Sequence, residues 1–480
     1  MNDLQSKAFE EWTQQEIVAE SMLPIIGNLY REKNIVCSIY GRKIVRESAI
    51  GLLKAHRFAR RVQSNQLNVH DTFPVLQAVA EMDLSPARLD LGKLTVQFQQ
   101  EADDRTLPEY LAQKLASISG AVTSILPEPR DVVLYGFGRI GRLLARILVE
   151  RTGGGDKLRL RGIVVRKGRE SDLHKRASLL RRDSVHGPFK GEVELDEENN
   201  AIIINGNVVQ LIYANSPDQI DYIEYGIDNA VVVDNTGIWR DETGLGLHLK
   251  STGVSQVLLT APGKGTIKNI VYGVNHNMVA PDDNIVSAAS CTTNAIVPVL
   301  KVINDKLTVV DGHIETVHSF TNDQNLIDNY HSKERRGRSA PLNLVLTETG
   351  AAKAVAKALP ELAGKLTGNA IRVPTPNVSL AILNLNTVEA TTKDELNDYL
   401  SQMAFHSDLR DQIDFTASTE VVSSDLVGSQ YASIVDSKAT IVHGNRCTVY
   451  VWYDNEAGYS NQVVRLLQDI TGLRYPSIPA

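Results

Sequence analysis

The stretch DVVLYGFGRIGRLLARIL, residues 131–148, decides the fold. It has the pattern of a short apolar strand, a glycine turn and a helix, and Gly136, Gly138 and Gly141 form a G-x-G-x-x-G motif. The first glycine of such a motif makes the tight turn, the second lets the backbone approach a pyrophosphate, and the third lets the helix pack against the strand. The helix N-terminus then offers free N–H groups to the phosphates. Alone the motif often marks only a tight turn, but between a strand and a helix it predicts dinucleotide binding.

The segments that follow continue this pattern of apolar strands and helices. Strands rich in Val and Ile are predicted over 158–165, 201–214, 230–236 and 256–262, with helical stretches between several of them. Strands that alternate with helices are typical of a parallel sheet with crossover helices. From about residue 290 the pattern changes to a helix, then strands, then a helix over 393–404, which predicts a second, α+β domain.

Residues 1–128 have helical periodicity, most clearly over 5–33, 42–63, 72–82 and 106–122. The segment ILPEPR, residues 125–130, contains two prolines and is predicted to be a linker. The segment from Arg42 to Arg61 carries seven Lys and Arg residues against the single acid Glu47. This basic segment is either a solvated face or a surface for an anionic partner.

Composition restricts the class of protein. The 480 residues have a formal net charge of −7, which gives no general case for nucleic-acid binding. Cys37, Cys291 and Cys447 are far apart and form no C-x-x-C pattern, so we predict no disulfide framework, no metal site and a reducing compartment. No apolar run approaches the ~18 residues that span a bilayer, and the polar N-terminus is unlike a signal peptide. We expect a cytoplasmic protein with no membrane partner.

The strand predicted over 158–165 does not end as in most NAD-binding folds. An acid is expected about 20 residues after the glycines, where it accepts hydrogen bonds from the ribose. Here the strand is followed by Arg166, Lys167 and Arg169. Basic side chains at that point attract a 2′-phosphate through charge-assisted hydrogen bonds, so NADP is a candidate beside NAD. The alternative is a solvated loop.

Cys291 lies in SAASCTTNAIVPVL, residues 287–300, at the predicted start of a helix. A helix N-terminus and a nearby imidazole lower a thiol pKa, and the adjacent N–H groups can face an oxyanion. His318, in ETVHSFT, is the candidate base, and the arginines of KERRGRSA and NAIRVPTPN are candidates for holding a phosphate. The ordinary alternatives are a buried structural cysteine, a structural histidine and solvated arginines.

Seven motifs together resemble the phosphorylating glyceraldehyde-3-phosphate dehydrogenase family. They occur in the order and at the spacing of that family from about 130 to 480, whereas the first 128 residues lie outside the resemblance. The motifs are YGFGRIGR, DSVHG, AASCTTNAIVPVLK, TVHSFTNDQ, TGAAKAV, LTGNAIRVPTPNVS and WYDNEAGYSNQV.

The resemblance implies the architecture. We expect an α/β protein with a Rossmann-type dinucleotide-binding domain over 129–290, completed by a C-terminal helix over 456–480. An α+β catalytic domain would occupy 291–455, and an all-α N-terminal extension would occupy 1–128.

The resemblance also implies the residues of the site. Cys291 would be the nucleophile and His318 the base that activates it. The residues expected to hold the substrate phosphate and inorganic phosphate are Ser290, Thr292, Thr321, Thr349, Gly350 and Arg372, with either Arg335 or Arg336. Those expected to contact the cofactor are Gly136, Gly138, Arg139, Ile140, Gly141, Thr236, Gly237, Thr260 and Asn455, beside Arg166 and Lys167 at the strand tip.

The function implied is oxidation of glyceraldehyde 3-phosphate to 1,3-bisphosphoglycerate, with NADP or NAD and inorganic phosphate, by a homotetramer. The sequence departs from the family at the adenosine end of the cofactor site, where Tyr135 replaces an asparagine and the ribose-binding acid is absent. Another phosphorylated aldehyde, such as erythrose 4-phosphate, is an alternative substrate. A regulatory or scaffold protein that keeps the fold is an alternative of a different class.

Overall fold

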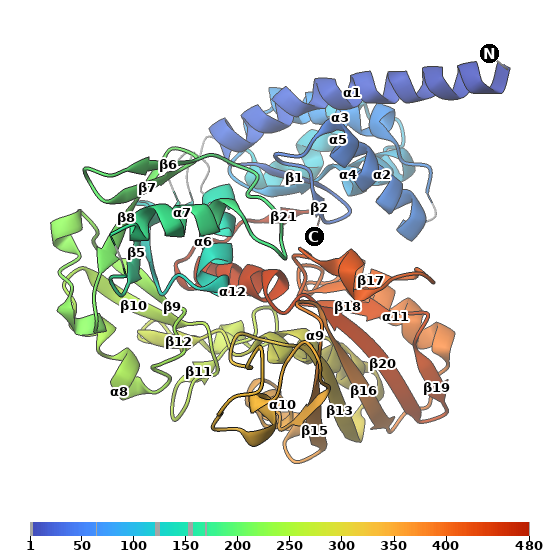
Figure 1. Cartoon of the computed structure of the whole chain (residues 1–480). Coiled ribbons are helices and arrows are strands. Elements are labelled where there is room, and N and C mark those ends of the chain that lie inside the picture. The colour runs from blue at the N-terminus through green and yellow to red at the C-terminus, as the bar shows by residue number, and fades with distance from the viewer. Residues whose placement is uncertain (1–2, 64, 121–124, 152–156, 169, 480) are drawn as a thin grey trace. The chain divides into compact units, whose positions relative to one another are not determined.

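The computed structural model describes residues 3–63, 65–120, 125–151, 157–168 and 170–479 (Figure 1). The chain forms two compact units. The large unit comprises Arg130–Arg151 and Leu158–Thr471, and the N-terminal unit comprises Met1–Pro129, Thr152–Lys157 and Gly472–Ala480.

The first part of the large unit is built on a nine-stranded sheet. Its strand order is β11-β12-β10-β9-β4-β5-β8-β7-β6, and all neighbours from β11 to β8 are parallel. The chain runs outward from β4 in one direction and later adds β9 on the other side, so the strand order reverses at β4, where such folds bind ligands. The strands are β4 (Arg130–Tyr135), β5 (Leu158–Val165), β6 (Val193–Asp196), β7 (Ala201–Ile204), β8 (Asn207–Tyr213), β9 (Ala230–Asp234), β10 (Val254–Leu259), β11 (Lys268–Asn269) and β12 (Ile285–Ser287).

The glycine turn joins β4 to α6 (Arg139–Arg151). Gly136 has φ +95°, which favours glycine, and a Cβ on Gly141 would overlap the Gly136 carbonyl oxygen. A Cβ on Gly138 would meet no atom within 4 Å. The turn therefore needs the first and third glycines for its own packing, whereas the second leaves open space at the start of the helix.

The remaining helices of this part are short, except the last. They are α7 (Asp172–Arg181), α8 (Glu242–Leu245) and α12 (Ala457–Ile470). Although α12 comes from the far end of the chain, it packs beside α6 (Figure 1). The predicted C-terminal helix over 456–480 is thus correct only as far as Ile470.

The second part of the large unit is an eight-stranded mixed sheet with three helices. Its strand order is β14-β15-β13-β16-β20-β18-β17, with β19 paired to β20. α9 (Cys291–Leu307) packs against β16, β18 and β20. The other elements are β13 (Val309–Ser319), β14 (Val345–Thr347), α10 (Ala351–Ala358), β15 (Leu366–Val373), β16 (Ser379–Thr387), α11 (Lys393–His406), β17 (Ile413–Thr416), β18 (Ser433–Asp436), β19 (Ile441–His443) and β20 (Arg446–Tyr453).

The N-terminal unit contains the predicted helices, but the all-α prediction is wrong. Its helices surround a four-stranded sheet of order β2-β1-β3-β21, in which the C-terminal strand β21 pairs in parallel with β3, Ser477 opposite Arg88. Strands of two to four residues carry too few alternating positions to show a period of two. The elements are α1 (Asp3–Lys33), β1 (Val36–Ile39), β2 (Arg42–Lys43), α2 (Ala49–Gln63), α3 (Val69–Glu81), β3 (Arg88–Asp90), α4 (Leu91–Glu101), α5 (Leu107–Lys114) and β21 (Ser477–Ile478).

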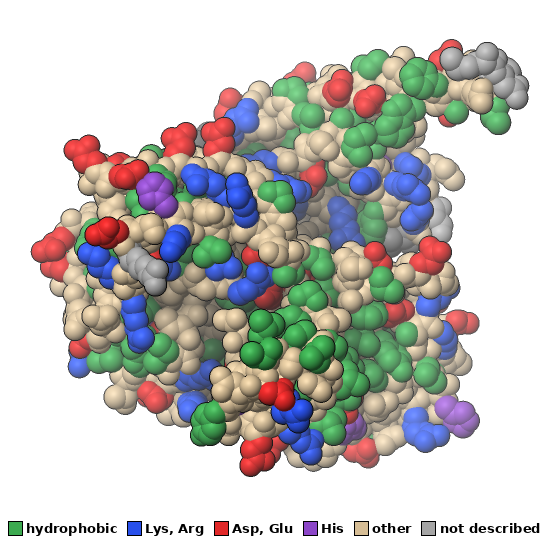
Figure 2. Space-filling view, viewed as in Figure 1, with side chains coloured by type: hydrophobic (Ala, Val, Ile, Leu, Met, Phe, Trp, Pro, Cys, Tyr) green, Lys and Arg blue, Asp and Glu red, His purple; other side chains and the backbone are tan. Residues whose placement is uncertain are grey.

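Two helix boundaries in this unit differ from the prediction. The helix expected over 42–63 begins at Ala49, because residues 42–43 form a strand and Arg46 adopts a left-handed φ of +62°. The helix expected over 106–122 ends at Lys114 and is followed by a short 3₁₀ turn, and residues 121–122 lie outside the described part. On α2 the exposed basic residues are Lys54, Arg57 and Arg61, and blue side chains gather over this helix in Figure 2.

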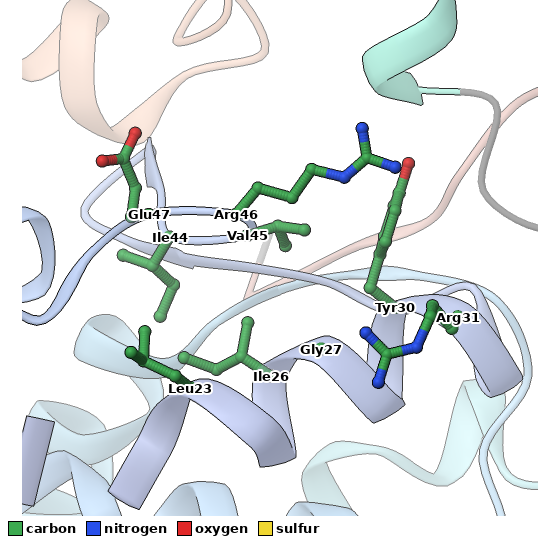
Figure 3. Close-up of a pocket in the computed structure, with 9 residues that line it drawn as sticks. All are labelled: Leu23, Ile26, Gly27, Tyr30, Arg31, Ile44, Val45, Arg46 and Glu47. Atoms are coloured by element: carbon green, nitrogen blue, oxygen red, sulfur yellow. The ribbon is translucent and has the colours of Figure 1, made fainter. Parts of the chain in front are cut away.

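A pocket of about 220 Å³ lies within the N-terminal unit (Figure 3). Leu23, Ile26 and Ile44 line it, and the Arg46 side chain extends toward Tyr30. The Arg46 guanidinium carbon lies 5.6 Å from the centre of the Tyr30 ring. None of the site residues predicted from the sequence lines this pocket.

Candidate active site

Cys291 is the first residue of α9, and the helix start is capped by its neighbour. The Ser290 hydroxyl oxygen accepts a hydrogen bond from the Thr293 N–H at 3.1 Å, which is typical of an N-cap. The Cys291 Sγ lies 3.6 Å from His318 Nε2. The structure therefore brings the predicted nucleophile and base together at a helix N-terminus, where partial positive charge stabilises a thiolate once it forms.

The protonation pattern of His318 follows from its second ring nitrogen. Nδ1 lies 2.6 Å from the Ser319 carbonyl oxygen, which can only accept a hydrogen bond. Nδ1 therefore carries the proton of the neutral ring, and Nε2 presents a lone pair to the thiol. His318 lies at the end of β13, a strand that pairs with β15 and β16 and fixes its backbone.

Arg372 supplies positive charge next to this pair. Its Nη1 donates to the Ser319 carbonyl and to Thr321 Oγ1, both at 3.0 Å, and lies 3.1 Å from His318 Nδ1. Burial and then the Arg372 charge lower the pKa of His318 to about 3. Burial raises the pKa of Cys291, and Arg372 opposes that shift. The pair is therefore neutral at pH 7 before any substrate binds.

The adjacent arginines Arg335 and Arg336 differ in the structure. Arg336 is half-buried, donates to Thr347 Oγ1 at 3.2 Å and pairs with Asp323 at 2.6 Å. Burial and the nearby positive charge of Arg336 both lower the pKa of Arg372. Arg335 is exposed. Of the two, Arg336 is therefore the arginine whose charge acts on Arg372 and His318.

The other predicted phosphate ligands divide between two places. Thr321 bonds to Arg372 and to the Asp323 carboxylate, and so belongs to the arginine cluster. Thr349 and Gly350 precede α10, and the Thr349 hydroxyl accepts from the Ala351 N–H at 3.2 Å. No hydrogen bond among the described residues joins Thr349 or Gly350 to the arginine cluster.

Tyr453 was not predicted. Its hydroxyl lies 3.0 Å from Thr292 Oγ1, and its ring centre lies 6.1 Å from that of His318. In the sequence it is one aromatic residue of an alternating strand, a pattern that indicates core packing, so nothing local to Tyr453 distinguishes it.

At the predicted cofactor-binding edge of the nine-stranded sheet, Thr236 and Thr260 follow the carboxyl ends of the adjacent strands β9 and β10. The Thr236 hydroxyl donates to Asp234 Oδ1 at 2.7 Å, and Thr260 donates to the Asp234 carbonyl at 3.0 Å. Gly237 follows with φ +63°. Asp234 is fully buried and lies 3.0 Å from His248 Nε2, so it anchors this edge of the sheet.

Arg139 is not oriented as a simple phosphate ligand. Its guanidinium bonds to Glu456 through Nε at 2.7 Å and to Asp183 through Nη1 at 2.8 Å. Ile140 is the second residue of α6. The groups that these two residues offer to a pyrophosphate are therefore backbone N–H groups at the helix N-terminus, beside the open space at Gly138.

The strand tip carries its two described basic residues on the surface. Arg166 and Lys167 follow β5, and both side chains are exposed. The Lys167 ammonium lies 5.7 Å from the centre of the Tyr213 ring. Burial raises the pKa of Tyr135 to about 12, and the positive charge of Arg166 opposes this shift. Arg169 lies outside the described residues.

The residues of this edge fit a dinucleotide. The turn leaves room where a Cβ at Gly138 would project, α6 begins directly after it at Arg139, and Asn455 is a buried amide whose Oδ1 accepts a hydrogen bond from Ser379 Oγ at 2.9 Å. Across the described ranges, no group of three or more His, Cys, Asp or Glu side chains could hold a metal ion. No helix in the same ranges is long and apolar enough to cross a membrane.

Comparison with known proteins identifies both parts of the large unit. Residues 130–242 match the NAD binding domain of glyceraldehyde 3-phosphate dehydrogenase, and residues 290–455 match the C-terminal domain of the same enzyme. The predicted α/β fold and the predicted nicotinamide dinucleotide cofactor are thereby confirmed.

Three relatives illustrate the extent of similarity. A glyceraldehyde-3-phosphate dehydrogenase-like protein of Pseudomonas aeruginosa is 62% identical over 460 residues, 95% of this chain and all of the relative. Glyceraldehyde-3-phosphate dehydrogenase of Zymomonas mobilis is 40% identical over 335 residues, 69% of this chain and 96% of the relative. The chloroplastic glyceraldehyde-3-phosphate dehydrogenase A of Zea mays is 40% identical over 341 residues, 70% of this chain and 81% of the relative.

Proposed function

Because the chain belongs to the glyceraldehyde-3-phosphate dehydrogenase family, we propose that it oxidises glyceraldehyde 3-phosphate reversibly to 1,3-bisphosphoglycerate with NAD(P) and inorganic phosphate. The observation that carries this proposal is the 3.6 Å approach of Cys291 Sγ to His318 Nε2, with Arg372 beside it. These are the nucleophile, base and anion-binding groups of an acyl-transfer site.

The chemistry begins at the thiol. His318 Nε2 accepts the thiol proton as Cys291 Sγ adds to the aldehyde carbon, and it returns that proton to the oxyanion that forms, which gives a thiohemiacetal and a neutral imidazole. The N–H groups at the start of α9 stabilise the developing oxyanion. His318 then takes the hydroxyl proton while the carbon is oxidised to a thioester. When bound, the cofactor supplies the hydride acceptor for this oxidation.

Phosphate completes the reaction. An oxygen of inorganic phosphate attacks the thioester carbonyl carbon, the carbon–sulfur bond breaks, and the leaving thiolate of Cys291 takes the proton back from His318 as the acyl phosphate departs. Arg372, Thr321 and Arg336 offer hydrogen-bond donors to phosphate oxygens on one side of the thiol. We assign the second anion position to Thr349 and Gly350 at the start of α10.

We further propose that NADP is used, alone or beside NAD. The exposed, basic residues Arg166 and Lys167 stand at the tip of β5, where an acid would bind the ribose of NAD. A relative described as chloroplastic is 40% identical over 341 residues, so the scaffold is shared across compartments. Arg166 is the stronger candidate for the 2′-phosphate, because its guanidinium can donate two parallel hydrogen bonds, whereas the Lys167 ammonium lies 5.7 Å from the centre of the Tyr213 ring.

We also propose that the protein is a homo-oligomer, a tetramer by analogy with the family, and that it acts in the cytoplasm. Apolar side chains on one segment support subunit contact, since large exposed apolar patches mark interfaces. Those side chains are Leu326, Ile327, Tyr330, Leu342 and Leu344, each at least 71% exposed. The division into a dinucleotide-binding domain over 129–290 and a catalytic domain over 291–455 is likewise proposed, and family matches at 130–242 and 290–455 support it.

The test is a steady-state assay with glyceraldehyde 3-phosphate or erythrose 4-phosphate, with NAD or NADP, and with or without phosphate. We expect the highest kcat/KM with glyceraldehyde 3-phosphate and a requirement for phosphate. A preference for erythrose 4-phosphate would transfer the assignment to that aldehyde, and inactivity with both would favour a regulatory protein that keeps the fold.

A further inference from the structure

Ser379 joins the two ends of the proposed active site. It is the first residue of β16 and is 1% exposed. Its Oγ donates a hydrogen bond to Asn455 Oδ1 at 2.9 Å and accepts one from the Ser319 N–H at 3.1 Å. Ser319 is the residue whose carbonyl receives Nδ1–H of His318 and Nη1–H of Arg372. One buried hydroxyl thus contacts the amide predicted to face the nicotinamide and the backbone that orients the base.

The chemistry of the three groups decides which one donates and which one accepts in the two hydrogen bonds of Ser379 Oγ. A hydroxyl has one hydrogen, and Asn455 Oδ1 can only accept it, so the Ser319 N–H must donate to an Oγ lone pair. The Asn455 amide is therefore held with Oδ1 toward Ser379, which reserves Nδ2 as a donor. Within the described part of the chain, Nδ2 makes no hydrogen bond of its own.

The backbone before Ser379 is held in an unfavourable conformation. Val378 is buried and has φ +63°, a region that residues branched at Cβ avoid. Its carbonyl accepts a hydrogen bond from the Ser319 hydroxyl at 2.9 Å. Such an outlier persists only where its surroundings fix it, and it is found mostly at functional sites.

We infer that Ser379 is a positioning residue that orients the Asn455 amide for the carboxamide of the nicotinamide cofactor and couples it to the Ser319–His318 backbone. This inference rests on the proposed function. It assigns Ser379 no chemistry, since the residue acts through Asn455 and Ser319. Its consequence is that loss of the hydroxyl weakens cofactor binding and slows oxidation together, while phosphate recognition by the arginine cluster is retained.

The test compares Ser379→Ala with Ser379→Thr in the full-length protein. Dissociation constants for NAD and NADP are measured by calorimetry, and KM and kcat are measured with each substrate in turn. We expect Ser379→Ala to bind both cofactors about tenfold more weakly, the loss typical of one buried hydrogen bond. We expect an unchanged KM for phosphate, and recovery to within about threefold of the wild type in Ser379→Thr.

The matched control is Ser251→Ala, which also removes a buried serine hydroxyl, one that donates to the Pro217 carbonyl at 2.7 Å. If Ser379→Ala does not fold, Ser379→Cys keeps the side-chain size with a poor donor and takes its place. Wild-type affinity in Ser379→Ala, or in Ser379→Cys where that variant replaces it, overturns the inference, and so does an equal loss in Ser251→Ala. The binding measurement needs no substrate, so it decides this point even if the proposed reaction fails.

Discussion

At the residue scale, burial keeps the Cys291–His318 pair neutral. The pKa of the thiol is raised, so the proton stays on sulfur until the pH rises. The pKa of the imidazole is lowered to about 3, so Nε2 is an unprotonated acceptor throughout the neutral range. Thiolate reactivity must therefore increase with pH rather than reach a plateau in mild acid.

Alkylation of Cys291 by iodoacetamide should accordingly accelerate as the pH is raised from about 6 to about 9. In His318→Asn the thiol has no base at Nε2, so alkylation near neutrality should be slower and turnover should fall by about 10²- to 10⁴-fold. Rates are followed by mass spectrometry of the peptide that contains Cys291. A pH-independent rate in the wild type would show that the thiol is already ionised.

Replacement of Cys291 by serine should abolish dehydrogenase activity, because a serine hydroxyl is a far weaker acid and a weaker nucleophile than a thiol, so His318 cannot activate it to the same extent. Cofactor binding should persist, since the glycine turn is untouched. Cys447→Ser is the control, as Cys447 is a buried thiol in β20 that has no predicted role. Substantial turnover in Cys291→Ser would remove the basis of the mechanism.

At the element scale, we expect the tip of β5 to set the preference between NADP and NAD. Replacing Arg166 by Gly and Lys167 by Asp should shift preference from NADP toward NAD. Each charge-assisted hydrogen bond lost should weaken NADP binding by about 1.5–3 kcal/mol. The ratio of kcat/KM for the two cofactors is the measurement, with Arg161→Ala on the same strand as control. An unchanged ratio in the double variant would mean that the basic tip is only a solvated loop.

The elements that could be predicted are those in which each residue has a separate physical task. The glycine turn was recognisable because Gly136 and Gly141 meet steric demands that other residues cannot. The helix start at Cys291 was recognisable because an apolar run begins at Ala295, and the Ser290 cap is what the structure adds. In contrast, Tyr453 and Ser379 could not be singled out, because their contacts come from strands that pair only in the folded sheet.

The sheet of the N-terminal unit was missed for the same reason. Its strands β1, β2 and β3 are two to four residues long, and β21 comes from the other end of the chain. Local periodicity does not report such pairing, and the helical pattern of the surrounding segments dominates the sequence.

At the scale of the whole molecule, the C-terminus is a part of the N-terminal unit. Gly472–Ala480 belong to it, and Ile478 packs against its core. Deletion of residues 472–480 should therefore lower the thermal stability of the N-terminal unit while the large unit keeps its cofactor affinity. Two separate transitions in differential scanning calorimetry, with only one shifted, are the expected result.

Residues 1–129 should be dispensable for chemistry. A chain of 130–471 removes both ends of the N-terminal unit together, which avoids leaving β21 without its partner strand. We expect turnover close to that of the full-length protein, with any change confined to assembly or regulation, as measured by steady-state kinetics and mass in solution. An inactive but folded 130–471 chain would show that the N-terminal unit completes the catalytic site.

The most direct test of the account is the fate of phosphate in a single reaction. Full-length protein is incubated with glyceraldehyde 3-phosphate, NADP or NAD, and isotopically labelled inorganic phosphate, and reduced cofactor and acyl phosphate are quantified together. The account predicts equal amounts of the two products, label in the acyl phosphate, and neither product in Cys291→Ser. Reduced cofactor formed without phosphate incorporation, or at the same rate in Cys291→Ser, would contradict a thioester on Cys291 that phosphate cleaves.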